Sequence, residues 1–210
     1  MEILRELVKN GKANETAERV AKLLEEGKDP ESIMKDALIP AMDEVGDLFQ
    51  KGDYFLPEML VAARAMQRGL DVLQPRLVER GVQPVGRVVI GTVKGDLHDI
   101  GKNIVTMALQ GAGFEVVDLG IDAPPDKFIE AIKRHNPQVV GLSALLTTTM
   151  PAMKNTIEAI KRAGLRNQIK IMVGGASVTQ TFADEIGADF YGCDSTEGRN
   201  FARNAAAGRV

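Results

Sequence analysis

The sequence predicts an α/β protein with two parts: an N-terminal four-helix bundle and, after it, a doubly wound five-stranded parallel sheet of the Rossmann or flavodoxin kind. Two observations support this prediction. From residue 1 to about residue 80 the apolar residues recur at helical spacing, and no alternating run indicates a strand. After residue 84, short continuous apolar runs alternate with helical stretches, as expected for parallel strands that are buried on both faces.

The first part contains several signals for helix ends. Asn14 is expected to cap a helix that ends near Gly27, and Asp29-Pro30 to start the next one, because Pro is favoured at the first helical position. Pro40 should kink this second helix, and Gly52 should end it. A last helix follows residues 54–57. The apolar sides of the last two helices contain Ile33, Met34, Ala37, Leu38, Met42, Val45, Leu48 and Phe49, and then Met59, Leu60, Ala63, Met66, Leu70, Val72 and Leu73.

Residues 81–84 (Gly-Val-Gln-Pro) break the helical pattern and are interpreted as a linker. We therefore expect a helical domain over residues 1–82 and a sheet domain over residues 83–210. The expected strands are 88–91, 116–118, 139–143, 171–174 and 189–191. The expected helices of the second domain are 101–113, 126–135, 150–163, 179–186 and one that begins near Ser195.

Composition excludes several classes of protein. With two His and one Cys, the chain cannot form a Cys-rich zinc site, a disulfide framework or a c-type haem attachment. The net charge of −3 and the scattered Lys and Arg residues argue against a nucleic-acid partner. The charged N-terminus and the lack of a long apolar segment argue against a signal peptide and a membrane span, so a cytoplasmic location is expected.

Ligands of such sheets bind at the carboxyl ends of the strands where the strand order reverses, which places the site in the loops 92–101 and 143–150. The first loop holds Asp96, His98 and Asp99. An imidazole near a carboxylate is typical of a metal ligand whose second nitrogen is held by an acid. Alternatively, an Asp of this loop caps the next helix and His98 is an ordinary loop residue. The loop does not match a phosphate-binding motif.

Two other strand ends contain small or hydroxylated residues. Ser143 and Thr147-Thr148-Thr149 follow the third strand, where hydroxyl groups often cap a helix. Gly174-Gly175 follows the fourth strand and allows either a tight turn or the close approach of another group. Taken together, the three strand ends indicate that a large ligand enters between them.

Asp96-Leu97-His98-Asp99-Ile100-Gly101 matches the Asp-x-His-x-x-Gly signature of cobalamin-binding domains. Ser143-x-Leu145 and Gly174-Gly175 match the two later elements of that signature, in order. The chain resembles the small corrinoid proteins of methanol and methylamine methyltransferase systems and the cobalamin region of cobalamin-dependent methionine synthase. The resemblance covers nearly the whole chain, because residues 46–49 and 54–58 look like the helical cap of those proteins.

The resemblance implies a role for each matching residue. His98 is expected as the lower axial ligand of cobalt, the metal of a bound cobalamin. Asp96 would hydrogen-bond the other imidazole nitrogen, and Thr149, where the family has Ser, would hydrogen-bond Asp96. The other residues expected to contact the cofactor are Asp99, Ile100, Gly101 and Leu145 in the signature, Ser143, Thr147, Gly174 and Gly175 around its nucleotide tail, and Phe55, Leu56 and Met59 over the upper cobalt face.

The resemblance also implies a function. The chain would be a methyl carrier that accepts a methyl group on Co(I) cobalamin from a substrate-specific methyltransferase. A second methyltransferase would pass the group to tetrahydrofolate or coenzyme M, and a reductive activation protein is a further expected partner. The chain would have no complete reaction alone. A cobalamin-dependent sensor is the alternative function, and a phosphoaccepting receiver domain on a similar sheet is the third function considered.

Three methionines and the single cysteine receive structural interpretations. Met34, Met42 and Met66 are expected in the core of the bundle rather than against the cofactor, because a methionine stripe at helical spacing usually packs a core. Cys193 is expected to be a small buried residue rather than a nucleophile.

Overall fold

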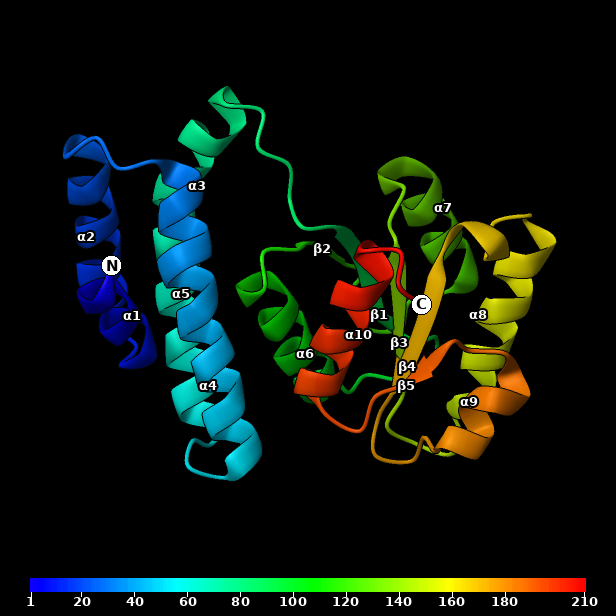
Figure 1. The fold of residues 1–210 in the computed structure, drawn as a ribbon. Helices are drawn as coiled ribbons and strands as arrows, with labels where there is room; N and C mark the ends of the chain where they lie inside the picture. Colours follow the sequence, from blue (N-terminus) through cyan, green and yellow to red (C-terminus); the bar gives the residue numbers. More distant parts are fainter. The chain divides into compact units, whose positions relative to one another are not determined.

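The computed structural model describes residues 1–210, which form two compact units (Figure 1). One unit comprises Met1–Pro84 together with Gln110–Gly113, and the other comprises Val85–Leu109 and Phe114–Val210. The first is helical, and the second is a parallel sheet with interleaved helices. The predicted fold class is therefore confirmed. No helix is both long enough and apolar enough to cross a membrane.

The helical unit is built from four rods. They are α1 (Glu2–Lys9), α2 (Ala13–Glu25), the continuous series α3 (Pro30–Ile33), η1 (Met34–Leu38) and α4 (Ile39–Lys51), and α5 (Leu56–Glu79). Met59, Ala62, Met66, Gly69 and Leu73 form the buried stripe of α5, at a spacing of three and four residues. Leu60 was expected on this stripe but points to solvent, because it lies one residue beyond Met59 and so faces another direction.

Two predicted helix starts have different outcomes. Asp29 caps α3, since its carboxylate accepts a hydrogen bond from the Ser32 N–H at 2.9 Å and Pro30 follows it. The prediction for Asn14 is wrong. Helix α2 begins at Ala13 after Lys12, so Asn14 lies inside its first turn. Met34, Met42 and Met66 are all buried, as expected for residues of the bundle core.

The irregularity expected at Pro40 takes the form of a π-helical turn just before it. Proline has no N–H, so the carbonyl of Asp36, four residues earlier, loses its helical donor. The Ile39 N–H bonds instead to Met34, five residues back. The guanidinium of Arg5, from α1, then supplies the missing donors: its Nε and Nη2 lie 3.0 and 2.7 Å from the Asp36 oxygen.

The second unit contains five parallel strands in the order β2-β1-β3-β4-β5. They are β1 (Arg87–Thr92), β2 (Glu115–Asp118), β3 (Val139–Ser143), β4 (Lys170–Gly174) and β5 (Phe190–Tyr191). The helices are α6 (Ile100–Gly111), α7 (Pro125–His135), α8 (Met150–Arg162), α9 (Gln180–Ile186) and α10 (Ser195–Ala206), with a short 3-10 turn η2 (Arg166–Gln168). Figure 1 shows α6 and α10 on one face of the sheet and α7, α8 and α9 on the other.

The register of the sheet aligns the strand ends that carry the predicted site. Thr92 of β1 pairs with Ser143 of β3, and Ser143 pairs with Gly174 of β4. The strand order reverses between β1 and β3, so the ligand loops of these two strands lie side by side. The core beneath one face is apolar and fully buried, and includes Val89, Phe128, Val140, Leu142, Met153, Ile157, Ile160 and Ile171.

Replacing Arg5 tests the bond that compensates for Pro40. Arg5→Met should lower the free energy of unfolding by about 1.5 kcal/mol, because it leaves the Asp36 carbonyl without its charged donor. In a Pro40→Ala background the same change should cost about 0.5 kcal/mol or less, since an alanine at this position restores the N–H donor. Urea unfolding of the four proteins measures this coupling. Equal costs in both backgrounds would contradict the explanation.

Candidate functional site

A single buried carboxylate, that of Asp96, is the centre of the candidate site. It is 0% exposed and accepts hydrogen bonds on both oxygens. The Oδ1 atom accepts from the backbone N–H of His98 at 3.0 Å and lies 2.8 Å from the Nδ1 of the same residue. The Oδ2 atom accepts from the N–H groups of Leu145 (2.8 Å) and Leu146 (3.4 Å) and from the Thr149 hydroxyl (2.5 Å). The carboxylate thus joins the loop after β1 to the loop after β3.

These hydrogen bonds determine the charge of Asp96. Burial alone would raise its pKa, because it penalises the ionised form. The donors of Thr149, of the His98 backbone and ring, and of Leu145 outweigh burial and hold the pKa of Asp96 well below its usual range. Asp96 is therefore an anion at neutral pH.

His98 is held in one orientation while its ring stays accessible. Asp96 binds its backbone N–H and its Nδ1, and the Thr92 hydroxyl donates to its carbonyl oxygen at 2.9 Å. The side chain is 50% exposed. With a carboxylate at Nδ1, the proton resides on that nitrogen, and the lone pair of Nε2 is left for a ligand or a metal.

The helix-capping alternatives do not describe Asp96 and Thr149. Thr149 occupies the N-cap position of α8 but its side chain makes no capping hydrogen bond, and it donates to Asp96 instead. Asp96 bonds to none of the N–H groups of α6. Asp99 stands directly before α6, where its carboxylate accepts from the side chain of Asn103 at 3.0 Å.

Gly174 and Gly175, at the end of β4, allow main chains to approach closely. Gly175 has φ +135°, and a Cβ at this position would lie 1.9 Å from the carbonyl oxygen of Ala144. Beside it, the Ser177 hydroxyl donates to the carbonyl of Leu145 at 2.6 Å. Because Leu145 also binds Asp96, the loop after β4 supports the loop that holds the carboxylate.

Several exposed apolar side chains lie near His98 in the chain or on the loop that is bonded to Asp96. Leu97 and Ile100 flank His98 in the chain, and Leu145 and Leu146 belong to the loop bonded to Asp96. Gly101 has no neighbouring atom within 4 Å of where a Cβ would be, so space is open beside it. An apolar surface near one accessible imidazole fits a large, mostly apolar ligand.

Other predicted residues stand apart from this cluster. Ser143 and Gly174 are half-buried at the ends of their strands, and Thr147 is exposed. In the helical unit, Phe55 is 66% exposed and Leu56 is half-buried. The expectation for Met59 is corrected, because its side chain is 2% exposed and packs in the core of the helical unit, where it cannot cover a ligand.

Cys193 is exposed, so the expectation that it is buried is wrong. The strand β5 ends at Tyr191, and Cys193 lies in the turn before α10 rather than in the sheet. Its hydrogen bond with Glu197 and the nearby carboxylate of Asp194 raise the pKa of the thiol. The thiol stays protonated at neutral pH, which agrees with the expectation that it is not a nucleophile.

Sequence reasoning missed several residues that support the site. Thr92 ends a buried strand with a hydroxyl group, the same signal that identified Ser143. Lys102 was considered only as part of a phosphate loop, yet its ammonium binds Asp118 at the end of β2. Asp122, in the segment after β2, accepts a hydrogen bond from the N–H of Gly95 in the loop after β1, which is called the His98 loop below. No local pattern marks either of these last two contacts.

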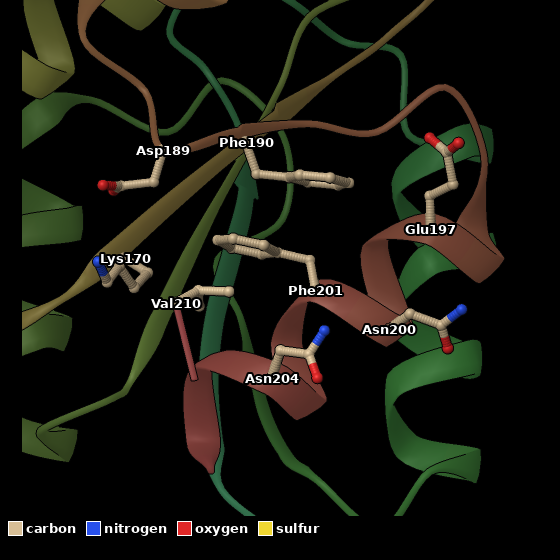
Figure 2. Close-up of a pocket in the computed structure, with 8 residues that line it drawn as sticks. All are labelled: Lys170, Asp189, Phe190, Glu197, Asn200, Phe201, Asn204 and Val210. Atoms are coloured by element: carbon tan, nitrogen blue, oxygen red, sulfur yellow. The ribbon is translucent and has the colours of Figure 1, made fainter. Parts of the chain in front are cut away.

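A pocket at the edge of the sheet is separate from this site (Figure 2). Figure 2 shows the rings of Phe190 and Phe201 stacked, and their centroids lie 4.5 Å apart. Lys170 and Asp189, which also line the pocket, stand at the amino ends of β4 and β5. The predicted ligand loops follow the carboxyl ends of the strands, so this pocket does not belong to them.

Comparison with known proteins agrees with the chemistry of the site. Two family models, each described as a B12 binding domain, match residues 86–202 and residues 1–74. The chain is 47% identical over 183 residues to trimethylamine corrinoid protein 1 of Methanosarcina mazei, covering 86% of this chain and 85% of that protein. It is 47% identical over 170 residues to dimethylamine corrinoid protein 1 of Methanosarcina acetivorans, covering 80% of each.

A solved structure is also similar to the chain. In the methanol:cobalamin methyltransferase complex MtaBC from Methanosarcina barkeri, one chain matches with a TM-score of 0.90 and 32% identity. The match covers 98% of this chain and 78% of that chain.

Replacing Asp96 should weaken the fold in a pH-dependent way. Asp96→Asn should lower the free energy of unfolding of the ligand-free protein by about 3 kcal/mol at pH 7, because an amide cannot accept from all of the donors. The folded-state pKa lies below the unfolded value of about 4, so the stabilisation is complete above pH ~4 and is lost as the pH falls below it. Urea unfolding at pH 7, 4 and 3 should show that the difference in the free energy of unfolding between the two proteins shrinks as the pH falls.

Asp99→Asn is the control, with an expected cost of about 0.5 kcal/mol. A pH-independent difference would refute the ionised state.

Gly175→Ala tests the close approach of the β4 loop. It should cost about 4 kcal/mol, because the added methyl group meets the Ala144 carbonyl and the backbone has positive φ. Gly164→Ala is the matched control, since Gly164 also has positive φ but no neighbour within 4 Å, and should cost about 1 kcal/mol. Thermal unfolding compares the two. Similar losses would mean that only the backbone conformation matters.

Proposed function

The chain belongs to the family of corrinoid proteins with B12-binding domains, and from this premise we propose that it carries a methyl group between two methyltransferases. The bound group is a cobalamin, whose cobalt supplies the chemistry of accepting and releasing the methyl group. The single observation that carries the proposal is the accessible imidazole of His98 held by the buried, ionised Asp96. The chain has no complete reaction alone.

His98 is proposed as the residue that would hold the cobalt, through Nε2. A ligand on a loop must be held in place to bind well, and His98 has tethers at its N–H, its Nδ1 and its carbonyl. The hydrogen bond from Nδ1 to Asp96 selects the tautomer and increases the basicity of Nε2. Thr149 completes the chain of hydrogen bonds behind the ligand.

His98 and Asp96 together fix the position of the imidazole proton. The Asp96 carboxylate lies 2.8 Å from the Nδ1 of His98 and holds the imidazole proton on that nitrogen. A low pKa of Asp96 supports this role, since the carboxylate stays charged.

The remaining residues of the signature are proposed to line the cofactor. Asp99, Ile100, Gly101 and Leu145 lie beside His98, where open space and apolar side chains favour a corrin ring. Ser143 and Gly174 are the last residues of β3 and β4, and Thr147 and Gly175 follow those strands. These four residues are proposed to flank the nucleotide tail.

The helical domain, residues 1–82, is proposed to protect the upper face of the cofactor bound by residues 83–210. Exposed Phe55 and half-buried Leu56 are the residues proposed for that contact. The methyl donor's enzyme is proposed to be a substrate-specific methyltransferase of the methylamine kind, given the identity to trimethylamine and dimethylamine corrinoid proteins. The acceptor enzyme would use tetrahydrofolate or coenzyme M, a reductive activation protein would keep the carrier active, and the setting would be cytoplasmic.

The two histidines of the chain provide a matched test. Purified protein is mixed with hydroxocobalamin, freed of excess cofactor by gel filtration and examined by absorption spectroscopy. The wild type and His135→Ala should shift the spectrum from that of free hydroxocobalamin. His98→Ala should abolish this shift and weaken binding about 100-fold, because it removes the residue that would hold the cobalt.

Two outcomes would count against the carrier role. An unshifted spectrum in the wild type, or the same spectrum in His98→Ala, would reject the proposed ligand. A cobalamin-dependent change of assembly with no methyl transfer to any partner would favour a sensor instead.

A further inference from the structure

Asp122 has an unusual backbone that the described site does not explain. Only Asp122 (φ 51°) and Asn136 (φ 46°) among the non-glycine residues have positive φ. Asn136 ends α7 in the left-handed conformation that is common after helices. Asp122 lies between β2 and α7 and caps no helix, so another interaction must compensate for its conformation.

Asp122 forms two hydrogen bonds with the beginning of the His98 loop. Its Oδ1 accepts from the N–H of Gly95 at 2.7 Å, and its own N–H donates to the carbonyl of Asp96 at 3.0 Å. The positive φ lets one residue offer both its side chain and its N–H to the same short stretch. The strained conformation therefore fixes the main chain on both sides of the Gly95–Asp96 peptide bond.

The same segment also holds the chain after the His98 loop. Asp118, at the end of β2, binds the Lys102 ammonium through both oxygens, at 2.6 and 2.5 Å. Lys102 lies in the first turn of α6 and is 3% exposed, and the side chain of Asp118 is 34% exposed. A buried ammonium with one carboxylate partner is tightly constrained in position.

Main-chain bonds complete the attachment. The Thr92 N–H donates to the Gly120 carbonyl and the Ala123 N–H donates to the Thr92 carbonyl, both at 2.9 Å. Residues 118–123 thus contact the loop that holds His98 at three places. They bind Thr92 before the loop, Gly95 and Asp96 at its start, and Lys102 after its end. None of the side-chain contacts of Asp118 and Asp122 involves His98 itself.

We propose that residues 118–123 act as a clamp that positions the His98 loop, with Asp122 and Lys102 as positioning residues that set how strongly His98 can bind the cobalt. This inference rests on the proposed function. Ligand strength depends on placing Nε2 to within a fraction of an ångström, and a loop reaches such precision only when its supports are themselves fixed. The clamp holds the main chain, while Asp96 holds the ring.

The test uses variants that keep the fold. Asp122→Gly removes the acceptor and tolerates positive φ, whereas Asp122→Asn keeps both the acceptor and the conformation. Lys102→Met removes the ion pair and keeps the apolar stem, and the partly exposed Asp118 remains solvated. Asn136→Gly is the control for the backbone change, and Arg87→Met is the control for an ion pair, because Arg87 binds Glu115 at the other end of β2.

The first readout uses aquocobinamide, a corrinoid without a nucleotide tail, reduced to Co(II) on the full-length protein. Electron paramagnetic resonance then shows the splitting caused by an axial nitrogen. Asp122→Gly and Lys102→Met should each lower the ratio of His98-bound to His98-free corrinoid about 10-fold. Asp122→Asn and both controls should stay within about 2-fold of the wild type.

The second readout needs no cofactor. Amide hydrogen exchange of Gly95 and His98 in the ligand-free protein should accelerate about 10-fold in Asp122→Gly and Lys102→Met, and not in the controls. Asp122→Asn should restore the wild-type rate. A purely structural role would instead change global stability and exchange throughout the sheet.

The outcomes separate the two proposals. If the wild type shows a His98-dependent nitrogen signal but Asp122→Gly and Lys102→Met match it in signal and exchange, the clamp is wrong and the carrier function stands. If the controls lose signal and protection as much as the clamp variants, the clamp is also wrong. If the wild type shows no His98-dependent signal, the proposed function is rejected, and the exchange rates still decide whether residues 118–123 position the loop.

Discussion

The Asp96 carboxylate must be surrounded by donors because it is ionised and has no access to water. An uncompensated buried charge costs several kcal/mol, and the donors around Asp96 together offset this cost. Those donors come from the loops after β1 and β3, and the parallel order of the sheet places the two loops next to each other. The need to satisfy one anion therefore fixes the geometry of both loops.

This constraint continues outward through the molecule. The loop after β3 is supported by the loop after β4, which Gly175 allows to approach because it has no side chain. The loop after β1 is supported by the segment after β2. Each strand end thus holds its neighbour, and the half-exposed imidazole of His98 lies at the centre of this arrangement.

Sequence patterns predicted what depends on local periodicity and missed what depends on contacts between distant segments. The strands were predictable because continuous apolar runs such as Val139-Val140-Gly141-Leu142 leave few alternatives. The Asp96 and His98 loop followed from a signature. The prediction for Asn14 is wrong because α2 begins one residue earlier, at Ala13. Met59 is wrong as a cofactor contact because its place on the buried stripe of α5 puts its side chain in the core. Asp122 and Lys102 could not be found, since their partners lie up to 27 residues away.

The long sequence separations around Asp96 also have a consequence for how the chain folds. Thr149 and Leu145 lie 53 and 49 residues from Asp96, so their bonds form only once β1 and β3 have paired. Contacts of this kind are among the last to form, because loop closure must come first. A half-folded chain has His98 but not its orientation, and a cofactor that recognises the oriented imidazole binds only the finished sheet. By mass action, a ligand that binds only the completed site draws the folding equilibrium toward completed molecules.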